Sequence, residues 1–163
     1  MAWVKLRFQV AGEVQVSRAF EASADQVQDM RDPLGRVGRS ILATVHEQFR
    51  TEGGYGGQRW KPLNRDYAAW KESQVGPEPI LVFSGLMRST LISGAAITVL
   101  PKRLVYEPRG PHAEIATYHQ GGAPERGLPQ RRVVQIPAPV ARMWERFFHE
   151  WLRTDVLWRF STG

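Results

Sequence analysis

Histidines are the first place to look for catalysis or metal binding, and the chain has four of them: His46, His112, His119 and His149. No HExxH motif occurs, and no two of these histidines are spaced i, i+4 on a predicted helix. The chain has no Cys, which excludes disulfides, thiolate zinc sites and Cys nucleophiles. His46 lies beside an apolar stripe, where a partly buried, hydrogen-bonded side chain is the simpler expectation.

Two further segments carry residue types that can do chemistry, but each lacks the residues that the chemistry requires. Ser84 follows Val82 and Phe83, so the first glycine of a GxSxG nucleophile elbow is missing. Residues 53–57 are rich in glycine, but no Lys-Ser/Thr pair follows them, and they come after a predicted helix rather than a strand. We therefore predict that the protein is not an enzyme and uses no cofactor and no metal. The alternative is a hydrolase without a recognisable motif. An exposed histidine whose substitution abolishes function but not folding would favour it.

Residues 53–63 form a glycine-rich loop that carries Tyr55 and Trp60 and ends in Pro62 and Leu63. Ordering such a loop costs backbone entropy, and aromatic side chains that do not reach the core are good anchors on a partner. We predict that Tyr55, Trp60, Pro62 and Leu63 lie at interfaces. The alternative, which the sequence leaves open, is that Trp60 and Pro62 fold back under the domain's own sheet.

The C-terminal residues form a second candidate interface. Leu157, Trp158 and Phe160 are large apolar side chains close to a terminus, and termini fray unless they are docked. If exposed, these side chains make a patch that favours association. They either complete the core behind the last helix or clasp a neighbouring chain, and we predict an interface.

The charge balance is basic and uneven. Lys and Arg number 22 against 16 Asp and Glu, which gives a net charge of +6, and most of the excess lies in the C-terminal half. Arginine favours planar, bidentate contacts and protein interfaces. Arg126, Arg131 and Arg132 are the best candidates for a lumen or an inter-subunit salt bridge. A non-specific nucleic-acid-binding module is the alternative function, and its binding would fall steeply with salt.

Periodicity predicts the elements that position these residues. Alternating apolar residues predict strands at 3–10, 14–20, 95–100, 104–107 and 133–136, while spacings of three and four predict helices at 33–51 and 65–73, at 111–122, and after Pro139.

No apolar run approaches the roughly 20 residues that span a bilayer, so no membrane contact is expected. We predict an α+β domain over 1–153 with an extension at 154–163. In it an antiparallel sheet of about four to five strands packs against the helix at 33–51 and a C-terminal amphipathic helix. The predicted core is Leu34, Val37, Ile41, Val45, Phe49, Val140, Trp144, Phe147, Phe148 and Trp151.

The order of several short motifs resembles the phage virion morphogenesis family, the tail-completion group of Mu-like and P2-like phages. The motifs are FRTEGG at 49–54, RWKPL at 59–63 with Tyr67, ILVFSGLMRSTL at 80–91, and AEIATYHQGG at 113–122 followed by PQRR at 129–132. Each motif alone is weak, but their order and spacing together are fairly specific. The resemblance covers about residues 34–153, and residues beyond Asp155 have no counterpart in it.

The resemblance implies a structural protein of the neck of a tailed phage, assembled in the host cytoplasm. It implies a homo-oligomeric ring, six-fold by the same resemblance, that acts in tail completion and head–tail joining. The implied partners are a head-closure or connector protein on one side and a tail terminator or tail tube protein on the other. Any contact with DNA in the lumen would be electrostatic and independent of sequence.

Overall fold

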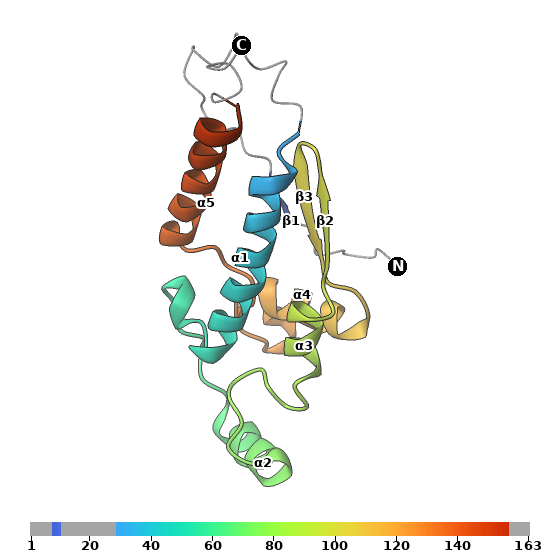
Figure 1. Cartoon of the computed structure of the whole chain (residues 1–163). Helices are drawn as coiled ribbons and strands as arrows, with labels where there is room; N and C mark the ends of the chain where they lie inside the picture. Colours follow the sequence, from blue (N-terminus) through green and yellow to red (C-terminus); the bar gives the residue numbers. More distant parts are fainter. Residues whose placement is uncertain (1–7, 11–28, 157–163) are drawn as a thin grey trace, which may run out of the picture. The chain divides into compact units, whose positions relative to one another are not determined.

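A computed structural model describes residues 8–10 and 29–156 (Figure 1). Its helices are α1 (Arg31–Arg50), α2 (Arg65–Val75), α3 (Leu86–Ile92), α4 (Pro111–Gly121) and α5 (Ala138–Trp151), and its strands are β1 (Phe8–Val10), β2 (Ala96–Leu100) and β3 (Arg103–Glu107). Three single turns complete the described part: η2 (Gly54–Gly56), η3 (Pro124–Arg126) and η4 (Leu152–Val156). None of the described helices is both long enough and apolar enough to cross a membrane.

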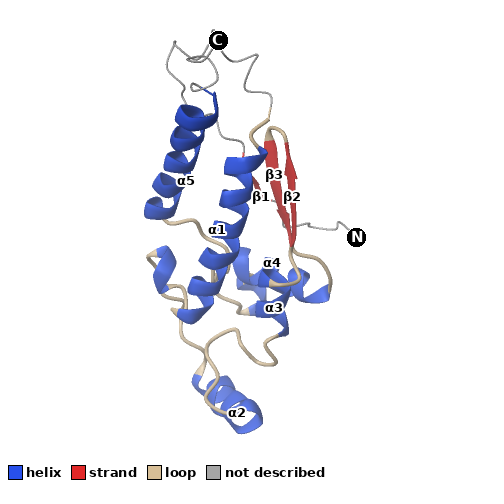
Figure 2. Ribbon diagram, in the orientation of Figure 1, coloured by secondary structure: helices blue, strands red, loops and turns tan. Residues whose placement is uncertain are grey.

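The sheet is smaller than the sequence predicts, and the prediction of four to five strands is wrong. In the described part of the chain, three strands are arranged in the order β1-β3-β2, and helices dominate (Figure 2). β1 runs antiparallel to β3, with Phe8 opposite Tyr106 and Val10 opposite Leu104. The α+β class itself holds. The strand predicted at 14–20 lies outside the described residues.

The strand predicted at 133–136 is a buried loop. Val133 and Val134 are buried, so their apolar character is explained without a sheet. The backbone N–H of Val134 donates to Oε1 of Gln120 at 3.0 Å, and Nε2 of Gln120 donates to the carbonyl of Val134 at 2.8 Å. A single amide side chain therefore satisfies both backbone groups of Val134, which a neighbouring strand would otherwise pair.

The predicted helix at 33–51 is confirmed as α1. Pro33 stands in its first turn, where a missing N–H costs nothing. Spacings of three and four place one stripe of apolar residues on a single face, and all of them are buried: Leu34, Val37, Ile41, Val45 and Phe49. The other predicted core residues Val140, Trp144 and Trp151 are buried too, whereas Phe147 and Phe148 are half-buried.

Contacts divide the chain into two compact units, and the division falls inside α1. Among the described residues, one unit comprises 41–96 and 107–137, and it contains α2, α3 and α4. The other comprises 8–10, 29–40, 97–106 and 138–156, and it contains α5. The predicted boundary between a domain at 1–153 and an extension at 154–163 stays a prediction.

In the second unit, α1 lies close to both the β2–β3 hairpin and α5. A Cβ on Gly38 would come within 2.9 Å of Cγ2 of Ile97 and 3.1 Å of a methyl of Leu104, so a glycine is needed where α1 meets the hairpin. On the α5 side, the indole N–H of Trp144 donates to the hydroxyl of Ser40 at 2.8 Å.

Candidate interaction surfaces

The glycine-rich loop folds back onto its own chain at Trp60. This side chain is only 5% exposed, and its ring meets that of Phe49 edge-on, with centroids 5.3 Å apart. Its indole N–H donates to the carbonyl of Arg132 at 2.9 Å, and Nε2 of Gln48 donates to the same oxygen at 2.9 Å. Of the two alternatives that the sequence leaves open, Trp60 takes the folded-back one within a single chain, against α1 rather than under the sheet.

Arg131 holds the end of this loop from inside. The side chain is 5% exposed, and its guanidinium donates to the carbonyl of Lys61 at 2.8 Å and to that of Pro62 at 3.1 Å. Burial lowers the pKa of Arg131 from its usual value, but the carbonyls of the loop take the place of water as acceptors. Pro62 is exposed and Leu63 is half-buried. The role of Arg131 at a lumen or in an inter-subunit salt bridge stays a prediction.

His119, on α4, is the most perturbed histidine. Burial, together with the positive charge of Arg131, lowers its pKa from 6.5 to about 4. Its Nδ1 is buried and has no hydrogen-bond partner among the described residues. The imidazole is therefore neutral at pH 7. The described residues hold no group of three or more His, Asp or Glu side chains placed to bind a metal ion.

The other residues singled out in the sequence are dispersed. Tyr55 is exposed, Arg132 is exposed, and Arg126 lies over the ring of Tyr118 at 5.3 Å from its centroid. The structure thus brings Trp60, Pro62, Arg131 and Arg132 together and leaves Tyr55 and Arg126 at the surface. Three predicted interface residues lie outside the described residues: Leu157, Trp158 and Phe160.

An exposed aromatic stack was not predicted. Tyr67 and Trp70 on α2 have centroids 5.4 Å apart, and Trp70 stacks on Phe83 at 5.7 Å with an interplanar angle of 14°. All three side chains are 44–50% exposed, as is Leu86 at the start of α3. Periodicity places Tyr67 and Trp70 on a shared face of a helix, but it does not say whether that face turns inward. We call these four residues the aromatic tip.

The support beneath the aromatic tip is polar. Lys71, on the inner face of α2, is 4% exposed, and its Nζ donates to the carbonyls of Glu78 and Pro79, both at 2.6 Å. Burial lowers the pKa of Lys71, while the carboxylates of Glu78 and Glu52 oppose this shift. The carboxylate of Glu52 in turn accepts the N–H of Ile80 at 2.7 Å. α2 therefore buries a lysine and exposes a tyrosine and a tryptophan, the reverse of the usual arrangement.

Two local features fix the position of this segment. Asn64 caps α2, and its Oδ1 accepts the N–H of Asp66 at 2.9 Å, which confirms the predicted helix start. Leu81, two residues before Phe83, has a φ of +63°, a left-handed conformation that is unfavourable for a leucine. Strain of this kind persists where the surrounding structure imposes it, and it is concentrated at functional sites.

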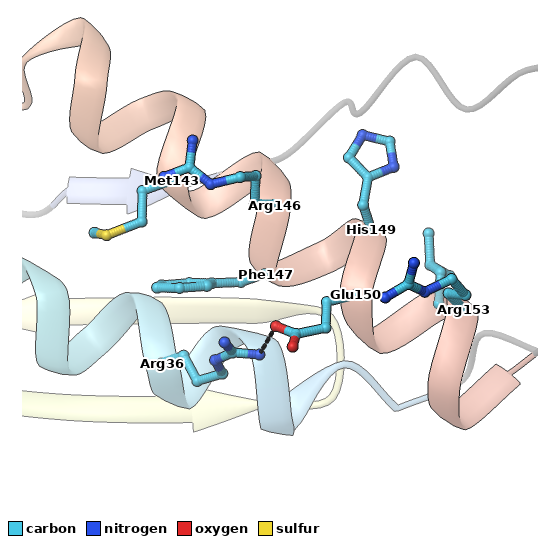
Figure 3. Close-up of a pocket in the computed structure, with 8 residues that line it drawn as sticks. Arg36, Met143, Arg146, Phe147, His149, Glu150 and Arg153 are labelled. Carbon is cyan, nitrogen blue, oxygen red and sulfur yellow. Dashed lines mark ion pairs between the residues drawn. The ribbon is translucent and has the colours of Figure 1, made fainter.

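A basic groove lies in the second unit, between α1 and α5 (Figure 3). It is an open hollow of about 770 Å³ and has an apolar part formed by Met143, Phe147 and Leu152. The guanidinium of Arg36 lies 4.3 Å from the centroid of the Phe147 ring and forms an ion pair with Glu150 at 2.8 Å. Arg146, His149 and Arg153 complete the lining. We call this the arginine groove.

Comparisons with known proteins place the chain in a family. A profile of the phage virion morphogenesis family matches residues 13–145. No curated protein matches the chain significantly, and no solved structure does. The matched segment contains the glycine-rich loop and the aromatic tip and ends within α5, so most residues of the arginine groove lie beyond it. The chain belongs to the phage virion morphogenesis family, and its role lies in the assembly of a phage particle.

Proposed function

We propose that this protein is a ring-forming subunit of the neck of a tailed phage, where it completes the tail and joins it to the head. The ring is six-fold, and it contacts a head-closure or connector protein on one face and a tail terminator or tail tube protein on the other. The subunit acts by binding alone and contributes no bond-breaking step.

The family match carries this proposal, and the surface of the first unit supports it. Among the described residues, the exposed large apolar side chains all fall in this unit: Tyr55, Tyr67, Trp70, Phe83, Leu86, Ile115 and Tyr118. Tryptophan and tyrosine are the residues most enriched at interface hot spots. Three of these rings contact one another above a polar framework, so the surface is already formed before a partner arrives.

Phage particles that lack this protein provide the test. Deletion of its gene should give filled heads and separate, finished tails that do not join, as seen by electron microscopy. Purified protein added to such a lysate should restore joined, infectious particles. Empty heads, or normal particles formed without the protein, would contradict a role in joining.

The alternative function is a non-specific nucleic-acid-binding module, and the salt dependence of DNA binding distinguishes it from a role in joining heads and tails. Fluorescence anisotropy with a labelled DNA duplex should show little binding by the free protein at physiological salt. Tight binding whose logarithm falls linearly with the logarithm of salt concentration would favour that alternative.

A further inference from the structure

The aromatic tip and the arginine groove have complementary charges. Over residues 65–86, which contain the aromatic tip, Asp66, Glu72 and Glu78 stand against Arg65 and the buried Lys71, a net charge of −1. The arginine groove carries Arg36, Arg146 and Arg153 against Glu150, a net charge of +2. An acidic segment is unusual in a chain of net charge +6. The most available basic partner for it in an assembly of identical subunits is another copy of the same chain.

The two surfaces also match in polarity. The tip exposes three rings in contact, of which Trp70 and Phe83 are stacked, and the groove is an open hollow with an apolar part formed by Met143, Phe147 and Leu152. In the groove, Arg36 already stacks on an aromatic ring of its own chain, which shows that this guanidinium is placed for a cation–π contact.

We propose that the aromatic tip of one copy docks into the arginine groove of the next copy. The contact is heterologous, because a projection on one subunit meets a hollow on another, and such contacts build rings when the rotation between subunits closes. Trp70 and Phe83 enter the groove, and Asp66 and Glu78 approach Arg146 and Arg153 at its edge. The inference rests on the ring of the proposed function and names the surfaces that form it.

Size predicts how strong a single contact is. A fully buried aromatic side chain removes about 150–250 Å² from water, so three half-exposed rings supply roughly 300 Å². A stable interface needs about 800 Å² on each partner. One tip in one groove is therefore a weak contact between free subunits, and the closure of a ring or docking on a tail must reinforce it.

Because a weak contact needs a trapping experiment, the absence of native Cys is an advantage. Ser73, one turn from Trp70 on α2 and exposed, is replaced in one full-length protein (Ser73→Cys), and the groove residue His149 in a second (His149→Cys). The two proteins carry different tags and are mixed at high concentration under mild oxidation. We expect a disulfide-linked heterodimer on a denaturing gel, because docking brings these positions together.

The matched control replaces Thr98, an exposed residue of β2, instead of His149 (Thr98→Cys). We expect the 73–149 pair to cross-link several times more than the 73–98 pair, and Trp70→Ala in the first protein to bring the 73–149 pair down to the level of the control. A charge swap adds a second readout: Asp66→Arg in one copy or Arg146→Glu in the other should weaken the cross-link, and the two together should restore it.

Two results would overturn the proposal. The first is a 73–149 yield no greater than that of the control pair, with all variants folded by circular dichroism. The second is a cross-link that forms only when Trp158 and Phe160 are replaced by serine, because the groove of the full chain would then hold its own C-terminal residues.

The outcome is separable from the proposed function. If particles lacking the protein fail to join but no specific 73–149 cross-link forms, then the neck role stands and the docking proposal fails. If the cross-link forms and depends on Trp70, but heads and tails join without the protein, then the contact stands and the neck role fails.

Discussion

At the scale of single residues, two tryptophans have opposite roles. Trp60 is 5% exposed and packs on Phe49, whereas Trp70 is 50% exposed. We expect Trp60→Ala to lower the free energy of unfolding by about 3–5 kcal/mol, and Trp70→Ala, which removes a half-exposed ring, to lower it by about 1–2 kcal/mol. Urea denaturation followed by circular dichroism measures both. A cost for Trp70→Ala as large as that for Trp60→Ala would mean that the aromatic tip serves the fold rather than a partner.

His119 gives the protein a pH-dependent stability. Its pKa in the folded state, about 4, lies below the value of 6.5 in the unfolded chain, so between these values the unfolded state binds more protons. The free energy of unfolding therefore falls as the pH drops from 6.5 to 4, by at most about 3 kcal/mol from this group. Denaturation curves across this range measure the effect.

A pair of histidine variants isolates the contribution of His119. The difference in unfolding free energy between wild type and His119→Gln should change with pH over this range, since carboxylates common to both proteins cancel in the comparison. His112→Gln, on the same helix, should follow the wild-type curve because it leaves His119 in place. Parallel curves for wild type and His119→Gln would refute the assignment.

At the scale of elements, the turn after α1 depends on one glycine. Gly53 has a φ of +88°, and a Cβ there would lie 2.6 Å from the carbonyl oxygen of Gln58 and 2.6 Å from the Trp60 ring. Gly57 has a similar φ of +92° but open space around it. We expect Gly57→Ala to cost about 1–2 kcal/mol, which is the backbone term alone. Gly53→Ala should cost at least about 2 kcal/mol more, because a clash is added.

Thermal denaturation of the two glycine variants, side by side, measures this difference. Equal melting temperatures for Gly53→Ala and Gly57→Ala would show that the Gln58–Trp60 segment shifts easily, and that the loop is not clamped by Arg131 as described. The chain has six tryptophans, so exposure of Trp60 in Gly53→Ala should also appear as a small red shift of the total tryptophan fluorescence.

The elements that could be predicted from the sequence have a clear local pattern. α1 has apolar residues on one face, which indicates that this face is buried, and the cap at Asn64 indicates the start of α2. The segment 133–136 could not be read correctly, because a short apolar run is equally consistent with a strand and a buried loop. Its backbone partner is the side chain of Gln120, fourteen residues away, and no local pattern records that pairing.

The candidate surfaces were predictable only in part, for a related reason. The composition of the glycine-rich loop indicates anchors, but the depth of Trp60 depends on Arg132, which is 72 residues away. The spacing of Tyr67 and Trp70 indicates a shared face, but that face is exposed because Lys71 occupies the inner side of α2. A lysine on the expected inner face of a helix was the one local signal that could have revealed the aromatic tip.

At the scale of the whole molecule, the proposed head-to-tail ring predicts that a defective subunit is dominant. In such a ring, each Trp70→Ala subunit would keep its groove and so enter the ring, but it would leave one contact unmade. With equal amounts of wild type and variant, only about one six-membered ring in sixty-four is free of the variant. Infectious particles from cells that co-express both should therefore fall far below half. A fall to one half would indicate subunits that act independently.

One carbonyl oxygen also sets an order of events during synthesis. The carbonyl of Arg132 accepts hydrogen bonds from Gln48 and Trp60, which precede it by 84 and 72 residues. Phe49 precedes Trp60, so their ring contact can form before Arg132 is added, but both hydrogen bonds must wait for this residue. The glycine-rich loop therefore gains its last contacts only late in translation.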